Sequence, residues 1–317
     1  MIIIFLNKLK EKYQQAIRKI NPEIDLVVAE KIKDVPEEKY KNAEIIVGWG
    51  FSDEWTPEIL EKAENLKWLH MLSAGVDKVP LEPLEKKGVI VTNSKGIHGI
   101  PIAEHVLGMM LAFARGLNIM RDQQMRKEWK RVRTDELWNK TLGIIGLGSI
   151  GAEIAKRAKA FGMKVIGLKR NVVKIEGVDE VWPNDRLIDL LKNSDYVVIA
   201  VPLNKETYHL IGEKELNVMK KEAYLINIGR GDLVDEHALI KALRSGRIKG
   251  FGSDVFSQEP LPADSPLYEM ENVIITPHQS GLSPMYMKRA MDIFTQNLQA
   301  YLSSSPMKNV VDFKLGY

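Results

Sequence analysis

The chain has 317 residues, of which 45% are hydrophobic and 27% charged, and its formal net charge is +3. This length is about twice that of a common single domain, so we expect two lobes with a cleft between them. The near balance of charge argues against a nucleic-acid or membrane partner and favours a small molecule. The absence of cysteine excludes disulfides, thiolate metal sites and a cysteine nucleophile, and we expect no metal.

The N-terminal part of the chain alternates apolar runs with amphipathic, helix-like stretches, which is typical of a parallel sheet built from βαβ units. Its first apolar run, residues 1–6, is too short for a signal peptide or a membrane span, and we expect a cytoplasmic protein by default. A long helical pattern at 101–130 opens with a proline. The strand-like runs of this part are residues 1–6, 26–28, 44–47, 66–71 and 89–92.

A second series of strand-like runs follows, so we predict an α/β fold with two Rossmann-like domains, each on a parallel sheet. The last helical stretch, 285–302, is expected to return to the first lobe, which makes that domain discontinuous. The predicted domains are therefore 1–97 with 285–317, and 98–284. The basic stretch 121–133 is interpreted as a solvated helix end, with a dimer contact as the alternative. The runs of the second series are residues 142–145, 165–168, 196–200, 224–228, 250–254 and 273–276.

A glycine motif, GLGSIG at 146–151, lies between the strand-like run 142–145 and an amphipathic segment. Gly146 can make a tight turn, Gly148 lets the backbone approach a pyrophosphate, and Gly151 lets helix and strand pack closely. This context predicts dinucleotide binding in the second domain. The alternative is a simple glycine turn.

Two cations follow the next strand-like run, at the position where an acidic residue would bind the ribose 2′-hydroxyl of NAD. These are Lys169 and Arg170, which can pair with a 2′-phosphate. NADP(H) is therefore the favoured cofactor. In the alternative, both cations are solvated and NAD(H) is used.

Three charged side chains follow predicted strands of the second domain, where ligands bind in open α/β sheets. Arg230 offers a planar fork for a carboxylate, and His278 can give or take a proton. A nearby Glu259 would favour the protonated imidazole. Together they suit the reduction of a 2-keto acid. Taken singly, they could be a turn residue, a structural histidine and a helix-entry charge.

The other five histidines lack such a setting, and we interpret them as structural. They are His70, His98, His105, His209 and His237.

At this point the chain resembles the D-isomer-specific 2-hydroxyacid dehydrogenases, through GLGSIG, INIGRGDLVDEHAL, SDVFSQEPLP and ITPHQSG. LSAGVD at 72–77 and TNSKGIHGIPIAEHVLGMML from Thr92 extend the resemblance to nearly the whole chain. It implies a substrate-binding lobe formed by both termini, a central nucleotide lobe and a homodimer formed through that lobe. It also implies hydride transfer between a nicotinamide cofactor and a small 2-keto or D-2-hydroxy acid.

The resemblance assigns a role to each candidate residue. Arg230 would bind the substrate carboxylate, His278 would be the acid-base, and Glu259 would stand behind it. The backbone of Ser73, Ala74, Gly75 and Val76 would help hold the carboxylate; Ser149 and Ile150 would touch the pyrophosphate; Val201, Pro202 and Thr207 would line the adenosine; the Ile228 carbonyl would face the nicotinamide; and Asp254 would lie near its carboxamide.

The departure from many NAD-using members is Lys169-Arg170, which makes the chain look like the NADP-using glyoxylate and hydroxypyruvate reductases. Trp49 is the residue we expect in the pocket for the substrate side chain; its alternative is an ordinary core aromatic. Which acid is bound, and the physiological direction, stay open.

Three other functions are compatible with this fold. A phosphoglycerate dehydrogenase-type activity is the main alternative. A formate dehydrogenase would resemble this chain with Gln in place of Glu259, which argues against it. A nucleotide-sensing corepressor without enzyme activity would be expected to carry disordered tails or an exposed peptide groove.

Overall fold

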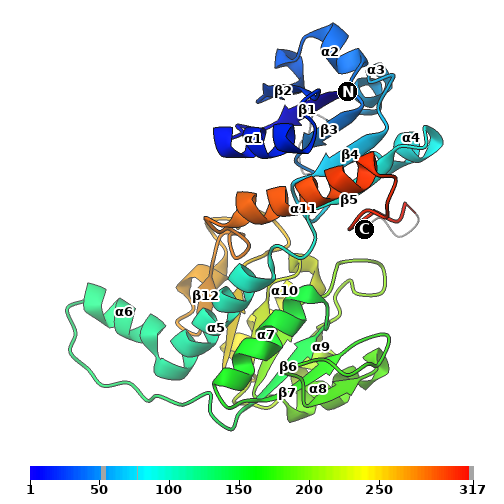
Figure 1. The fold of residues 1–317 in the computed structure, drawn as a ribbon. Coiled ribbons are helices and arrows are strands. Elements are labelled where there is room, and N and C mark those ends of the chain that lie inside the picture. The colour runs from blue at the N-terminus through cyan, green and yellow to red at the C-terminus, as the bar shows by residue number, and fades with distance from the viewer. Residues whose placement is uncertain (51–54, 77, 314–317) are drawn as a thin grey trace. The chain divides into compact units, whose positions relative to one another are not determined.

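The structure is a computed structural model that describes residues 1–50, 55–76 and 78–313. The chain divides into two compact units (Figure 1): unit 1 comprises Met1–Ile97 with Ser283–Tyr317, and unit 2 comprises His98–Leu282. Each unit is an α/β body on one parallel sheet, so the predicted fold class is confirmed. The chain returns to unit 1 at Ser283, whereas the sequence pattern places that return at residue 285.

Unit 1 contains a five-stranded parallel sheet. Its strands are β1 (Ile2–Leu6), β2 (Asp25–Ala29), β3 (Ile45–Gly48), β4 (Trp68–Met71) and β5 (Ile90–Asn93), in the order β2-β1-β3-β4-β5. Its α-helices are α1 (Glu11–Ile20), α2 (Glu37–Lys41), α3 (Pro57–Lys62), α4 (Leu81–Lys86) and α11 (Tyr286–Leu302).

The apolar residues of β1 bury both faces of this sheet, because successive side chains of a strand point to opposite sides. Ile3 and Phe5 share a core with residues of α1 and α11, where the Phe5 and Phe294 rings lie 6.0 Å apart. Ile4 and Leu6 share the opposite core with residues of α2, α3 and α4. The C-terminal helix thus completes the core of unit 1, which explains why this unit is discontinuous.

Unit 2 contains a seven-stranded parallel sheet. Its strands are β6 (Thr141–Ile145), β7 (Lys164–Leu168), β8 (Glu180–Trp182), β9 (Tyr196–Ile199), β10 (Tyr224–Asn227), β11 (Gly250–Ser253) and β12 (Val273–Ile275), in the order β12-β11-β10-β9-β6-β7-β8. The direction of this order reverses between β6 and β9, and ligands bind at such a reversal in open α/β sheets.

Helices cover both faces of this sheet. The α-helices of unit 2 are α5 (Gly99–Arg115), α6 (Leu117–Met125), α7 (Ser149–Ala160), α8 (Leu187–Asn193), α9 (Glu213–Val218) and α10 (Glu236–Arg244). Helices α5 and α7 lie side by side in Figure 1 and pack on one face, while residues of α8, α9 and α10 pack on the other.

The prediction of one helix over 101–130 was wrong. Gly116 adopts φ +64°, the left-handed conformation that ends α5, and the next helix stops at Met125. Among the described residues, no single helix is long and apolar enough to cross a membrane; α5 and α6 pass that test only as a pair bent by 70°. The cytoplasmic location stays a prediction.

Candidate active site

The glycine loop connects β6 to α7 at the reversal of the sheet order. Gly146 has φ +104°, and a Cβ at this position would lie 2.6 Å from the Ala200 carbonyl oxygen, just past β9. A Cβ on Gly151 would lie 2.3 Å from the Gly146 carbonyl oxygen. Both glycines are therefore required by close backbone approach, as predicted from the motif.

The loop fits a dinucleotide phosphate. A Cβ built on Gly148 meets nothing within 4 Å, so the backbone there faces open space. Ser149, exposed, begins α7, and no side chain caps this helix end, whose N–H groups and dipole favour an anion. Ile150 is half-buried and packs against the core beneath α5. The pyrophosphate of a dinucleotide is the ligand that this arrangement suits.

The two cations after β7 differ in their surroundings. The Lys169 ammonium donates to the Leu147 carbonyl at 2.8 Å, and so braces the glycine loop. Arg170 is exposed, and no hydrogen bond or ion pair links it to another residue of the described ranges. Arg170 is therefore the cation more available to a ligand.

The loop after β9 is closed by its own hydrogen bonds. The Thr207 hydroxyl donates to the Pro202 carbonyl at 2.7 Å and accepts from the Asn204 N–H at 2.8 Å. Val201 packs beside Gly146, with Cγ1 2.7 Å from a Cβ built there. The loop thus abuts the glycine motif, while its contacts to an adenosine stay a prediction.

A buried asparagine holds the loop that carries Arg230. The Asn227 amide donates to the Arg230 carbonyl at 2.8 Å, and its oxygen accepts from the Gly229 N–H at 3.0 Å. The Arg230 guanidinium is exposed and donates to the Gly229 carbonyl at 2.9 Å. Ile228, which lies between Asn227 and Gly229 in the sequence, is buried. The backbone is thereby fixed, while the charge faces outward.

The Arg230 loop packs directly against the loop after β11. A Cβ on Gly231 would lie 1.9 Å from the Phe256 carbonyl carbon, so only glycine fits between the two backbones. The Phe256 N–H donates to Glu259 Oε1 at 3.0 Å. The other oxygen of Glu259 lies 2.7 Å from His278 Nδ1, and the His278 side chain is 52% exposed. The predicted Glu–His pair is thus present.

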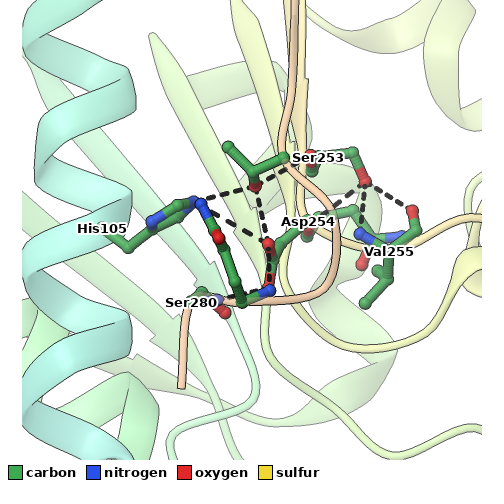
Figure 2. Close-up of polar contacts among 8 residues, drawn as sticks. His105, Ser253, Asp254, Val255 and Ser280 are labelled. Atoms are coloured by element: carbon green, nitrogen blue, oxygen red, sulfur yellow. Dashed lines mark hydrogen bonds and ion pairs between the residues drawn. The ribbon is translucent and has the colours of Figure 1, made fainter. Parts of the chain in front are cut away.

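Asp254 organises the segment that carries His278 (Figure 2). Its carboxylate, 1% exposed, accepts from the Thr276 hydroxyl at 2.6 Å, the Gln279 N–H at 2.9 Å and the Ser280 N–H at 2.8 Å. The Asp254 carbonyl accepts from the His278 N–H at 2.9 Å. Asp254 therefore fixes the backbone of the turn at residues 278–280, through its carbonyl at His278 and its carboxylate at Gln279 and Ser280.

Three residues of this network were not singled out by the sequence. Asn227 and Thr276 stand at strand ends inside the quoted motifs, which was a signal that could have found them. His105, on α5, was interpreted as structural, and its Nε2 lies 3.0 Å from Thr276 Oγ1. Burial lowers the pKa of His105, and the Asp254 charge opposes this.

The predicted substrate residues of unit 1 form a connected group of their own. The Ser73 hydroxyl accepts from the Gly50 N–H at 2.9 Å and donates to the Gly75 carbonyl at 2.8 Å. Trp49, half-buried after β3, has its ring 5.5 Å from that of Tyr286. Ala74 and Gly75 are half-buried, Ser73 and Val76 are buried, and Asp77 lies outside the described residues. No group of His, Asp and Glu in the described ranges could hold a metal.

Comparison with known proteins decides the family. The model of the D-isomer specific 2-hydroxyacid dehydrogenase, NAD binding domain, matches residues 107–280. The chain is 36% identical over 309 residues to a glyoxylate reductase of Pyrococcus horikoshii, covering 92% of this chain and 91% of that one. The chain belongs to the D-isomer-specific 2-hydroxyacid dehydrogenases.

The dehydrogenase is also 40% identical over 281 residues to a D-3-phosphoglycerate dehydrogenase of Methanocaldococcus jannaschii, with 87% of this chain aligned. It spans about half of that relative, 53% of its length. A solved D-isomer-specific 2-hydroxyacid dehydrogenase family protein of Aeromonas salmonicida superposes with a TM-score of 0.86 at 34% identity, covering 98% and 99% of the two chains. The dehydrogenase is an oxidoreductase that uses a nicotinamide cofactor and acts on small 2-hydroxy or 2-keto acids.

Proposed function

We propose that this dehydrogenase reduces glyoxylate to glycolate or hydroxypyruvate to D-glycerate, with NADPH as the favoured reductant. The observation that carries the proposal is the His278–Glu259 pair, 2.7 Å apart and open to solvent, with the Glu259 loop packed against the loop that bears Arg230. Relatives named glyoxylate reductase, such as that of Pyrococcus horikoshii, support the choice of substrate.

The proton is handled by His278. Because Nδ1 faces Glu259, the proton at that nitrogen is held by the carboxylate, and Nε2 is the atom left to meet the substrate. In reduction, Nε2–H protonates the substrate oxygen as the carbonyl at C2 becomes an alcohol; in oxidation, Nε2 takes that proton back. The nicotinamide, when bound, supplies or accepts the hydride at C2.

The carboxylate of the substrate would be bound by Arg230, whose guanidinium is exposed and matches a carboxylate in shape. The proposal also gives the backbone of Ser73 to Val76 a part in holding it. Trp49, beside Tyr286, would face the substrate side chain.

A phosphoglycerate dehydrogenase-type activity is the second candidate, favoured by the 40% identity to the Methanocaldococcus jannaschii relative. The two candidates differ in substrate, because only phosphohydroxypyruvate carries a phosphate. They share the proton chemistry.

The preference for NADP(H) rests on Arg170, which is exposed and lies next to the braced Lys169. An arginine fork can bind a 2′-phosphate, while NAD lacks this group. Similar solved proteins hold either cofactor: one of Xanthobacter autotrophicus is named in complex with NADPH, and a D-lactate dehydrogenase of Aquifex aeolicus with NAD. We expect Arg170 to contribute more than Lys169.

The reaction is tested by following nicotinamide absorbance with glyoxylate, hydroxypyruvate, pyruvate and phosphohydroxypyruvate. We expect the first two to be reduced fastest, and His278→Ala to lower kcat by about 10²–10⁴-fold, the usual contribution of a general acid. Full turnover by His278→Ala would refute the proposal. The fastest turnover with phosphohydroxypyruvate would instead favour the second candidate.

The cofactor preference is tested with Arg170→Ala. Loss of a charged hydrogen bond should raise KM for NADPH about tenfold or more and leave KM for NADH unchanged. Arg244→Ala, at an exposed arginine on α10, is the matched control. An equal change in both KM values would contradict the 2′-phosphate assignment.

We further propose a homodimer. Support comes from large apolar side chains exposed on and after α6: Leu117 at 51%, Met125 at 67%, Trp129 at 102% and Trp138 at 63%. Such a concentration is typical of an interaction surface. Light scattering during size exclusion should give twice the chain mass, and a monomer would reject the proposal.

A further inference from the structure

His105 lies on α5, far along the chain from the catalytic loops, yet its ring reaches the strand end after β12. Its Nε2 is 3.0 Å from Thr276 Oγ1 and 4.0 Å from Asp254 Oδ1, so only the first distance is a hydrogen bond. Figure 2 shows the ring pointing from the helix toward Asp254. The His105 side chain is 21% exposed.

The direction of these bonds follows from the carboxylate. An ionised carboxylate can only accept hydrogen bonds, so the Thr276 hydroxyl donates its single proton to Asp254 Oδ1, at 2.6 Å. Toward His105 the hydroxyl oxygen must then accept, and Nε2 must carry a proton. The result is a directed chain from the His105 N–H, through the Thr276 hydroxyl, to the Asp254 carboxylate.

The same carboxylate fixes the turn that presents His278. It accepts the Gln279 and Ser280 N–H groups, which immediately follow the histidine. His278 itself adopts φ +49°, a left-handed conformation that is uncommon for a side chain of this size and needs its surroundings to hold it. Any rotation of the carboxylate would shift these bonds together.

We propose that His105 is a positioning residue for the acid-base His278, acting through Thr276 and Asp254. The relay, defined as His105, Thr276 and Asp254, holds the carboxylate in the rotamer that accepts both turn N–H groups. The His278 imidazole is thereby kept in place against Glu259. This inference rests on the proposed role of His278.

The test uses paired substitutions on the full chain. His105→Met removes the donor but keeps an apolar side chain of similar length, while His105→Gln offers an amide N–H near the position of Nε2. Thr276→Val removes the hydroxyl and keeps the shape, while Thr276→Ser keeps the hydroxyl. Each variant is assayed for kcat, for KM and for cofactor binding by nicotinamide fluorescence.

We expect His105→Met and Thr276→Val to lower kcat by about 10–100-fold, the scale of a misplaced catalytic group, with both KM values and cofactor binding unchanged. His105→Gln and Thr276→Ser should stay within about threefold of wild type. Because His105 and Thr276 act through the same series of hydrogen bonds, losing both should cost no more than losing one. The double variant His105→Met with Thr276→Val should therefore be no slower than the slower single variant.

Opposite results overturn the relay. A packing role would make His105→Gln as slow as His105→Met, and independent roles would make the two single effects multiply. Loss of cofactor binding in both His105→Met and Thr276→Val would mean that the residues support the fold rather than His278. Wild-type turnover in His105→Met, with His278→Ala inactive, rejects the relay alone; an active His278→Ala rejects the proposed function first.

Discussion

A buried polar network lies near the carboxyl ends of strands in each sheet, and the two networks have different roles. In unit 1, Thr92 accepts from the Trp68 indole N–H at 2.8 Å, and its hydroxyl lies 2.7 Å from His70 Nδ1. The Ser94 hydroxyl, also buried, donates to the Met71 carbonyl at 3.1 Å. In unit 2, the network around Asp254 leads to His278, which is half exposed.

The two networks differ in whether their last side chain is buried or exposed. The side chains of the unit 1 network, Trp68, His70, Thr92 and Ser94, are all fully buried, so their hydrogen bonds stabilise the core. In unit 2, the buried Asp254 fixes the turn at residues 278–280, while the His278 side chain stays exposed to a ligand. A buried polar network can therefore either complete a core or fix a reactive side chain, depending on whether its last member reaches the surface.

Among the substitutions that test this contrast, the largest loss of stability and activity is expected at Gly231, in unit 2. Gly231→Ala would force a Cβ to within 1.9 Å of the Phe256 backbone, so the Arg230 and Glu259 loops must separate. Overpacking of this kind costs about 1–3 kcal/mol or more of unfolding free energy. Displacement of the loops should lower kcat/KM about 100-fold. Urea unfolding and steady-state kinetics check both values, and wild-type kinetics would show that the loops do not need this contact.

The closed network predicts acid sensitivity in unit 1. Burial lowers the pKa of His70 from its ordinary 6.5 to about 3, so the folded chain keeps this ring neutral where the unfolded chain protonates it. The resulting stability is complete above pH 6.5 and is lost as the pH falls from 6.5 toward 3. The slope of this loss is about 1.4 kcal/mol per pH unit.

His70→Leu should be less stable than wild type at pH 7, because Thr92 and Ser94 lose a partner. Its stability should also fall less steeply between pH 6.5 and pH 4. Denaturant titrations at several pH values measure the difference, with the exposed His237→Leu as control. Equal slopes for wild type and His70→Leu would contradict the assignment.

The smallest effect is expected at Gly108, an exposed position within α5. A Cβ there meets nothing within 4 Å, unlike at Gly231. Gly108→Ala should therefore raise the unfolding free energy by about 0.5–1 kcal/mol, the difference in helix propensity. Thermal unfolding measures this gain while turnover stays at wild type. A loss of stability would mean that the position is packed in the assembled protein.

Much of the fold could be predicted because apolar runs and turn residues coincide with its strands, as at β1 and β9. The helix break at Gly116 could not, since glycine is tolerated within helices as well as after them. Strand β8 was missed because its sequence is Glu180-Val181-Trp182, preceded by a charged residue and followed by a proline, whereas β12, equally short, is a continuous apolar run. The candidate site could be predicted where its residues follow strands, but the bond from His105 to Thr276 joins positions 171 residues apart, which no local pattern records.

The close approach of Gly231 to Phe256 has a consequence for how such an enzyme can be altered. Arg230, Glu259 and His278 all belong to unit 2 and are carried on mutually packed backbones. Trp49, by contrast, belongs to unit 1. The proposed roles therefore predict that substitutions in unit 1 change the substrate range while Arg230, Glu259 and His278 keep their arrangement.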